Sequence, residues 1–163
     1  MGNTRYLWNR FLEQVNPDLE HPLEAYVESV LFEATKDLDC AVAFSHTQPF
    51  IPIQKIAQVA GLARLAKTNL CIHPTYGPWF SLRAVIYLTE SFNIQNSAIH
   101  DPCDGCLCGV QLELAWQNSK DWKRWLAMRD ACVVGRAYRY SDDQIAYHYT
   151  KDKAILRRPD SDR

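Results

Sequence analysis

Arg83 stands inside an apolar stretch, "WFSLRAVIYL" (Trp79 to Leu88), that has the composition of a buried strand. A guanidinium group keeps its charge, so a buried arginine needs a carboxylate, a carbonyl group or an anionic ligand beside it. Two interpretations are open: a structural ion pair with one of the 19 acidic residues, or bidentate recognition of a carboxylate or phosphate. Arg129, near two tryptophans in "WKRWLAMRD", adds weight to the second interpretation, and a solvated side chain is its alternative.

Four cysteines form the second group with chemical potential. Cys103, Cys106 and Cys108 lie in "HDPCDGCLCG", and Cys132 follows in "RDACVVG". Four thiolates suffice to hold a zinc ion or an iron–sulfur cluster. The spacing departs from the ferredoxin pattern, because the third cysteine comes one residue early and Val133 replaces the usual proline. These four cysteines are candidate metal ligands, and a loop of reduced thiols without metal is the alternative.

Composition narrows the class of protein. The chain has 163 residues, enough for one domain with a core of its own. A formal net charge of −1 gives no electrostatic footprint for nucleic acid or an acidic membrane surface. No apolar run approaches the ~20 residues of a membrane span, and "MGNTRYLWNR" lacks the layout of a signal peptide. We therefore expect a cytoplasmic protein whose cysteines are reduced, metal-bound or redox-active.

Hydrophobic periodicity predicts the elements that must position these groups. Helical spacing runs from Thr4 to Val15, from Pro22 to Leu38 and from Ile53 to Ala63. Strands are predicted at Cys40–Phe44 and Phe80–Leu88. In the second strand Phe80, Leu82, Ala84, Ile86 and Leu88 share one face, and Arg83 lies on the other.

The second half of the chain reads as a loop followed by two helices. The loop is predicted over Asn93–Gly109, a helix starting at Ser119 follows, and Ser141 with Gln144 forms a capping box for the last helix. The expected fold class is α/β (α+β), with one domain over residues 1–156 and a polar tail over 157–163. Two clear strands are few for this class, so we expect the first strands to be missing.

Three segments carry a resemblance to a known family. They are "PIQKIAQVAGLA", "CIHPTYGPWFSLRAVI" and "WLAMRDACVVGRAYRYSDDQIAYH". Their order and motifs resemble the CblC-type cobalamin-processing family, the cytosolic cyanocobalamin decyanases and alkylcobalamin dealkylases. The most specific part is the block I-H-P-x-[YF]-G-x-W-F-x-[IL]-R, which ends at Arg83.

The resemblance implies a flavin-nitroreductase-like fold, a sheet with flanking helices, that holds cobalamin with its benzimidazole tail displaced. It implies removal of the upper axial ligand, either with reduced flavin (FMN) or with glutathione as thiol donor. Arg83 and Arg129 match the family arginines that hold the glutathione carboxylates. The residues implied for cobalamin binding are His73, Tyr76, Gly77, Trp79 and Gln58, the last standing where the family has a histidine.

Two departures from the family keep other functions open. The family's strands before "GNTR" are expected to be absent, and the cysteine-rich loop is foreign to the animal members. That loop resembles bacterial relatives near the cobalamin-dependent epoxyqueuosine reductase, which favours an iron–sulfur oxidoreductase as one alternative. The other is a non-catalytic domain that delivers cobalamin or binds a partner. Unpaired edge strands would then favour a homodimer or a partner subunit.

Overall fold

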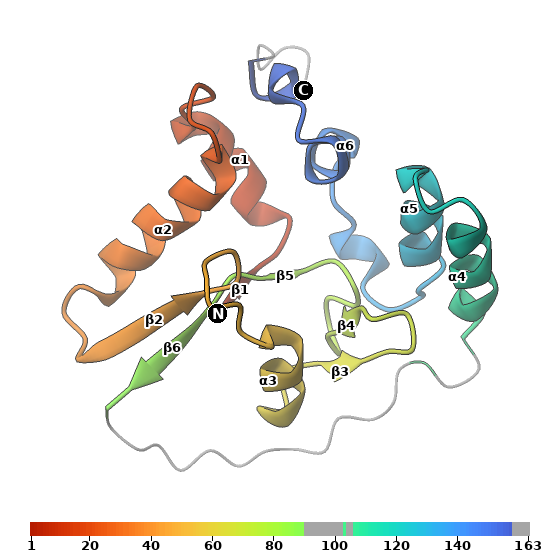
Figure 1. Ribbon diagram of the computed structural model, residues 1–163, viewed down its shortest axis with the longest axis horizontal. Helices are drawn as coiled ribbons and strands as arrows, with labels where there is room; N and C mark the ends of the chain where they lie inside the picture. The colour runs from red at the N-terminus through yellow and green to blue at the C-terminus, as the bar shows by residue number, and fades with distance from the viewer. Residues whose placement is uncertain (90–102, 104–105, 158–163) are drawn as a thin grey trace. The chain divides into compact units, whose positions relative to one another are not determined.

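The computed structural model describes residues 1–89, 103 and 106–157, and the chain divides into two compact units. Unit 1 comprises Met1–Ile51, Arg83–Phe92 and Tyr140–Arg163, and unit 2 comprises Pro52–Leu82 and Asn93–Arg139. In the described residues the fold is mixed α/β, as predicted, with six α-helices and short strands (Figure 1). The division into one domain over 1–156 stays a prediction.

Unit 1 contains most of the elements that the sequence predicted. The strand β2 has the predicted bounds, and Pro22 occupies the first turn of α2, where its missing N–H costs nothing. The helix α2 ends three residues before Leu38. The elements are β1 (Gly2–Asn3), α1 (Tyr6–Gln14), α2 (Pro22–Thr35), β2 (Cys40–Phe44), β6 (Ala84–Leu88), α6 (Asp142–Thr150) and a 3-10 helix (Lys153–Arg157).

The core of unit 1 lies between the helices and one face of an antiparallel strand pair. β2 and β6 pair with Val42 opposite Ile86 and Phe44 opposite Ala84 (Figure 1). Alternation predicted this face correctly for Ala84 and Ile86, but Leu88 is 46% exposed. The buried members of the core are Trp8, Phe11, Leu23, Val27, Leu31, Ala84, Tyr147, Ile155 and Leu156.

The predicted continuous strand Phe80–Leu88 is wrong at Arg83. It consists of β5 (Ser81–Leu82) and β6, and Arg83 separates them. The Arg83 N–H donates to the carbonyl oxygen of Met1 at 3.0 Å, and its own carbonyl oxygen accepts from the N–H of Ser45 at 2.8 Å. These partners are remote in sequence, so local periodicity could not reveal the break.

Among its described residues, unit 2 contains short strands, three α-helices and a 3-10 helix. β3 and β4 pair antiparallel, and α4 lies beside α5, where Trp116 and Trp125 meet edge to face at 5.1 Å (Figure 1). The helix α3 ends at Val59, before the predicted limit at Ala63. The elements are α3 (Ile53–Val59), β3 (Arg64–Leu65), β4 (Cys71–Ile72), β5 (Ser81–Leu82), α4 (Cys108–Gln117), α5 (Trp122–Asp130) and a 3-10 helix (Arg136–Tyr138).

Two predictions for this half of the chain are wrong, and one is confirmed. Cys108 and Gly109, predicted as loop, belong to α4, and the rest of the predicted loop lies mostly outside the described residues. Asp121, not Ser119, caps α5, because its carboxylate accepts from the Lys123 N–H at 3.0 Å. Ser141 does cap α6, accepting from the Gln144 N–H at 3.3 Å.

Candidate functional site

A tight turn in unit 2 holds four of the residues implied for cobalamin binding. His73 and Gly77 exchange two backbone hydrogen bonds, each of 2.9 Å. The His73 Nδ1 accepts from the backbone N–H of Thr75 at 3.0 Å and of Tyr76 at 3.3 Å. Burial lowers the pKa of His73, and protonation at Nδ1 would break both bonds. The neutral ring therefore carries its proton on Nε2.

Gly77 faces a second glycine that the sequence reasoning missed. Both have positive φ, +57° at Gly77 and +73° at Gly135. A Cβ at Gly77 would lie 1.9 Å from the carbonyl oxygen of Val134, and one at Gly135 would lie 2.2 Å from the carbonyl group of Tyr76. Two backbone segments therefore touch where neither residue tolerates a side chain. The glycine in "CVVG" was the available signal.

Aromatic rings surround this turn. The rings of His73 and Tyr76 lie 4.5 Å apart, and His73 also meets Phe80 edge on at 5.6 Å. Tyr76 packs edge to face against Tyr138 at 4.8 Å. These contacts fix the rings of the two half-buried residues, His73 and Tyr76, in defined orientations.

Arg129 supports the same turn from α5. Its Nε and Nη2 donate to the carbonyl oxygen of Pro78 at 3.0 and 2.5 Å, and its guanidinium carbon lies 4.5 Å from the ring centre of Trp79. Trp79 is 1% exposed. Arg139, bound to Asp130 at 2.8 Å, lies 5.6 Å from the same ring. Sequence reasoning singled out Arg129 and Trp79 but missed Arg139 and Asp130.

Gln58 lies on the exposed side of α3, in the same unit as the turn. Its Oε1 accepts from the backbone N–H of Leu65 at 2.9 Å. The side chain thus connects α3 to the start of the β3–β4 pair. This contact gives Gln58 a structural role. A role of Gln58 in cobalamin binding stays a prediction.

Arg83 belongs to unit 1, and its guanidinium group is only partly satisfied there. Its Nε donates to the Asn3 Oδ1 at 2.6 Å. Its Nη2 is buried and makes no hydrogen bond within the described part of the chain. A buried donor without an acceptor costs roughly 1–3 kcal/mol, and more when it is charged.

The charges around Arg83 do not form a simple ion pair. Burial lowers the pKa of Arg83, while Tyr140, Glu24 and Tyr147 act in the opposite direction. The Glu24 carboxylate lies 3.6 Å from the Lys151 Nζ, so its charge is shared with another cation. Burial raises the pKa of Tyr147 to about 12, so this tyrosine presents a neutral hydroxyl group at neutral pH.

The structure brings the four predicted cysteines into one neighbourhood of unit 2. The Cys106 N–H donates to the Cys103 carbonyl oxygen at 3.1 Å, and the thiols of Cys106 and Cys108 share a hydrogen bond. Burial, that bond and the nearby thiols raise the pKa of Cys108 to about 12. Within the described ranges, no cluster of three or more His, Cys, Asp and Glu residues is arranged as a ready metal site. Metal binding therefore stays a prediction.

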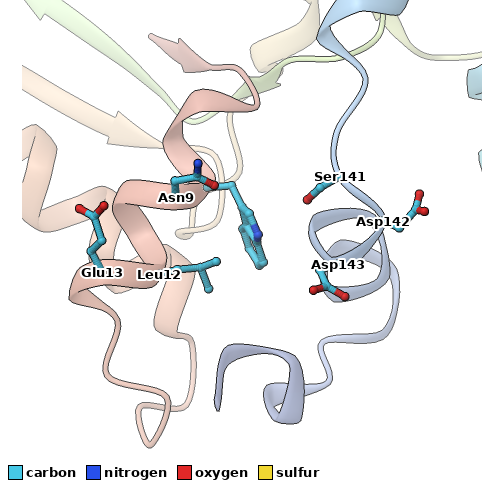
Figure 2. Close-up of a pocket in the computed structure, with 7 residues that line it drawn as sticks. Asn9, Leu12, Glu13, Ser141, Asp142 and Asp143 are labelled. Carbon is cyan, nitrogen blue, oxygen red and sulfur yellow. The ribbon is translucent and has the colours of Figure 1, made fainter. Parts of the chain in front are cut away.

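A pocket in unit 1 was not anticipated from the sequence. Its volume is about 560 Å³, and it lies between α1 and the start of α6 (Figure 2). In Figure 2 Leu12 and Ser141 point into the space between these helices, and Glu13 points away from it. The lining residues are Trp8, Asn9, Leu12, Glu13, Ser141, Asp142 and Asp143, none of which was a predicted site residue.

Comparison with known proteins places these features in a family. Residues 63–157 match the Methylmalonic aciduria and homocystinuria type C family, and the chain belongs to that family. The matched range contains the turn at 73–79, Arg83, Arg129 and all four clustered cysteines.

Two relatives show how far the similarity extends. A Danio rerio protein named cyanocobalamin reductase / alkylcobalamin dealkylase is 31% identical over 94 residues, which is 55% of this chain and 36% of that protein. The chain thus spans about a third of that relative's length. The crystal structure of a C. elegans B12-trafficking protein, CblC, matches with a TM-score of 0.66 and 18% identity. It covers 96% of this chain and 76% of the C. elegans chain, which shows a shared fold. No helix among the described residues is long and apolar enough to cross a membrane.

Proposed function

We propose that the chain binds cobalamin and removes its upper axial ligand. The observation that carries this proposal is the family match over residues 63–157, which includes the pre-formed turn at 73–79. The name of the Danio rerio relative supports the reaction, and that of the C. elegans protein supports the ligand. The flavin-nitroreductase-like form of the fold belongs to the same proposal, as does a cytoplasmic location.

In this proposal the turn supplies an ordered surface for the corrin ring. The half-buried ring of Tyr76 is fixed by Tyr138, and the Nε2–H of His73 is the group that would donate a hydrogen bond to the corrin, since its Nδ1 already accepts from the Thr75 N–H. His73 does not act as a cobalt ligand. Ligation through Nε2 would move the proton to Nδ1, where two backbone N–H groups already donate.

Arg83 is the residue proposed to bind a carboxylate of glutathione. Its Nη2 is buried without an acceptor, so a carboxylate placed there would satisfy a donor that otherwise costs free energy. The glutathione sulfur then bonds to the alkyl carbon, while the cobalt–carbon bond breaks and leaves its electron pair on cobalt. In this proposal the contribution of Arg83 is to position glutathione for the reaction.

Arg129 has a different place in the proposal. Two of its N–H groups are directed at the Pro78 carbonyl oxygen, and its guanidinium lies on Trp79. Any contact of Arg129 with glutathione has to coexist with this support of the turn. Loss of cyanide needs electrons instead of a thiol, and reduced FMN is the proposed donor. We assign no residue of the described chain to the flavin.

A spectroscopic titration tests the proposal. We expect the full chain, added to methylcobalamin or cyanocobalamin, to change the visible spectrum as the benzimidazole leaves cobalt. Tyr76→Ala should weaken this binding, whereas Tyr87→Ala, which changes a tyrosine 49% exposed on β6, should leave it intact. An unchanged spectrum at high protein concentration would refute cobalamin binding.

The same titration separates a second candidate function, delivery without processing. The description of the C. elegans protein as a B12-trafficking protein favours this alternative. If the spectrum shifts but neither glutathione nor reduced flavin removes the upper ligand, the chain is a carrier. The predicted partner subunit would then be the protein that receives the cobalamin. Size-exclusion chromatography would detect that partner, and it would also detect the predicted homodimer.

A further inference from the structure

The backbone of Arg83 and Ala84 forms a β-bulge opposite Met1. The N–H groups of Arg83 and Ala84 both donate to the Met1 carbonyl oxygen, at 3.0 and 3.4 Å. The Met1 nitrogen donates in turn to the carbonyl oxygen of Ala84 at 2.7 Å. Two residues therefore oppose one, which shifts the alternation of side chains along the strand and redirects the side chain of Arg83. Ala84 is 0% exposed in the core of unit 1, and the Arg83 Nη2 atom is buried as well.

Asn3, on β1, binds this redirected side chain. Its Oδ1 accepts from the Arg83 Nε at 2.6 Å, and its Nδ2 donates to the carbonyl oxygen of Thr4 at 3.1 Å. The two bonds use the acceptor end and the donor end of one amide, so only one orientation of the amide satisfies both. Asn3 is half-buried and lies two residues after Met1, the partner of the bulge. The bulge and the Asn3 amide thus hold Arg83 through its main chain and its side chain.

The contact with Asn3 leaves two properties of Arg83 available to a ligand. The amide is neutral, so it satisfies one N–H without offsetting the positive charge. The bond also occupies the Nε–H, so a carboxylate can form two parallel hydrogen bonds only with the Nη1–Nη2 edge of the guanidinium group. Nη2 belongs to that edge, and it is buried without an acceptor among the described residues. Asn3 therefore determines which edge of Arg83 faces an anion.

We propose that Asn3 is a positioning residue for Arg83 and that it directs a carboxylate to the Nη1–Nη2 edge. This inference rests on the proposed binding of a glutathione carboxylate at Arg83, and it adds a residue outside the family match over 63–157. The neutrality of Asn3 is part of the inference. An aspartate at this position would accept the same bond, but it would pair with Arg83 and compete with the ligand for the positive charge.

Asn3→Asp separates positioning from a purely structural role. Aspartate keeps an oxygen acceptor for the Arg83 Nε and supplies a counter-charge, so the melting temperature should not fall below that of the parent. The glutathione concentration for half-maximal demethylation of methylcobalamin should nevertheless rise about tenfold, because a charge-assisted bond to the ligand is weakened. The maximal rate and the spectral shift on cobalamin binding should stay unchanged. Asn9→Asp is the matched control, since it makes the same change of charge at an exposed residue of α1 and should keep the parent's glutathione requirement.

Two further variants show whether Asn3 acts through Arg83. Asn3→Ala removes the acceptor without adding a charge, and it should raise the glutathione requirement by a smaller factor, because the guanidinium group loses its fixed orientation. Asn3→Asp should add nothing to the requirement of Arg83→Gln, since the group that it neutralises is then missing.

The outcomes distinguish the role of Asn3 from the proposed function. A glutathione requirement equal to that of the parent in Asn3→Asp and Asn3→Ala would overturn the role of Asn3 alone. So would an effect of Asn3→Asp that has the same size with and without Arg83. If the parent shows no dependence on glutathione, the proposed glutathione site is refuted, and this inference is refuted with it.

Discussion

Substitution of Gly77 by alanine should destabilise unit 2 strongly. Gly77 has a φ of +57°, and its Cβ would lie 1.9 Å from the carbonyl oxygen of Val134. The obstructing atom belongs to the backbone, so it cannot rotate away as a flexible side chain would. Alanine at this position therefore forces the turn and the segment after α5 apart.

The magnitude follows from two contributions. An L-residue with a left-handed backbone costs ~1–2 kcal/mol, and overpacking that shifts the backbone costs ~1–3 kcal/mol. We expect a loss of about 2–5 kcal/mol in the free energy of unfolding, a large share of the ~5–15 kcal/mol of a typical domain. Gly135→Ala disturbs the same contact, because its Cβ would lie 2.2 Å from the carbonyl group of Tyr76. The double variant should therefore lose less than the sum.

Urea denaturation of the parent, Gly77→Ala and Gly109→Ala measures the effect. Gly109 lies in α4, and its Cβ would meet no heavy atom within 4 Å, so this variant should be at least as stable as the parent. If Gly77→Ala unfolds at the same urea concentration as Gly109→Ala, the close contact between the two segments is refuted.

Three further predictions concern the elements that hold the turn. The free energy of unfolding should fall as the pH drops through about 6.5, because burial lowers the pKa of His73 and the unfolded chain then binds the proton more readily. Thermal denaturation at several pH values measures this decline. It should be weaker in His73→Asn, whose side chain does not titrate. Asp121→Ala removes the N-cap of α5 and should lower the free energy of unfolding by about 1 kcal/mol, whereas Ser119→Ala should lower it by less than about 0.5 kcal/mol. Equal losses in denaturant titrations would contradict the assignment of the cap to Asp121. Arg129→Lys should lower the melting temperature, because an ammonium group cannot donate two parallel bonds to the Pro78 carbonyl oxygen and lie flat on an aromatic ring. An unchanged melting temperature would show that a positive charge at this position is enough to support the turn.

Local sequence patterns predicted the elements whose stability is local. Apolar residues at helical spacing identified α1 and α2, and Ser141 with its partner three residues later identified the start of α6. Hydrophobic periodicity did not predict the helix α4, because its apolar side chains do not form one buried face. Val110 is 57% exposed and Trp116 is 62% exposed. Without a face to bury, periodicity gives no signal.

The candidate site was predictable in residue types but not in contacts. The sequence singled out Arg129 and Trp79, yet the bonds from Arg129 to Pro78 span 51 positions and depend on how α5 packs. Cys132 was proposed as the fourth thiol of the cluster on residue type alone, and the structure places it with the others. The pocket between α1 and α6 gave no signal, since Ser141 and Asp142 have an adequate explanation as residues of a helix start.

The last prediction separates the two interpretations of Arg83. If Arg83 holds a carboxylate of glutathione, Arg83→Gln should raise the glutathione requirement for demethylation of methylcobalamin about tenfold to hundredfold, since one charge-assisted hydrogen bond is worth ~1.5–3 kcal/mol. Folding should suffer less, because the Glu24 carboxylate left behind still has Lys151 at 3.6 Å. The measurements are thermal denaturation and demethylation rate against glutathione concentration.

Glu24→Gln is the control that decides between the two interpretations. If Arg83 and Glu24 formed a structural pair, either substitution would strand a buried charge and cost ~3–5 kcal/mol of stability. The Arg83 Nη2 has no acceptor within the described residues, so we expect Glu24→Gln to leave the glutathione requirement unchanged. The opposite result is a strong loss of stability in both variants, with the same glutathione dependence in the protein that remains folded. It would show that Arg83 is a structural residue and that it does not bind glutathione.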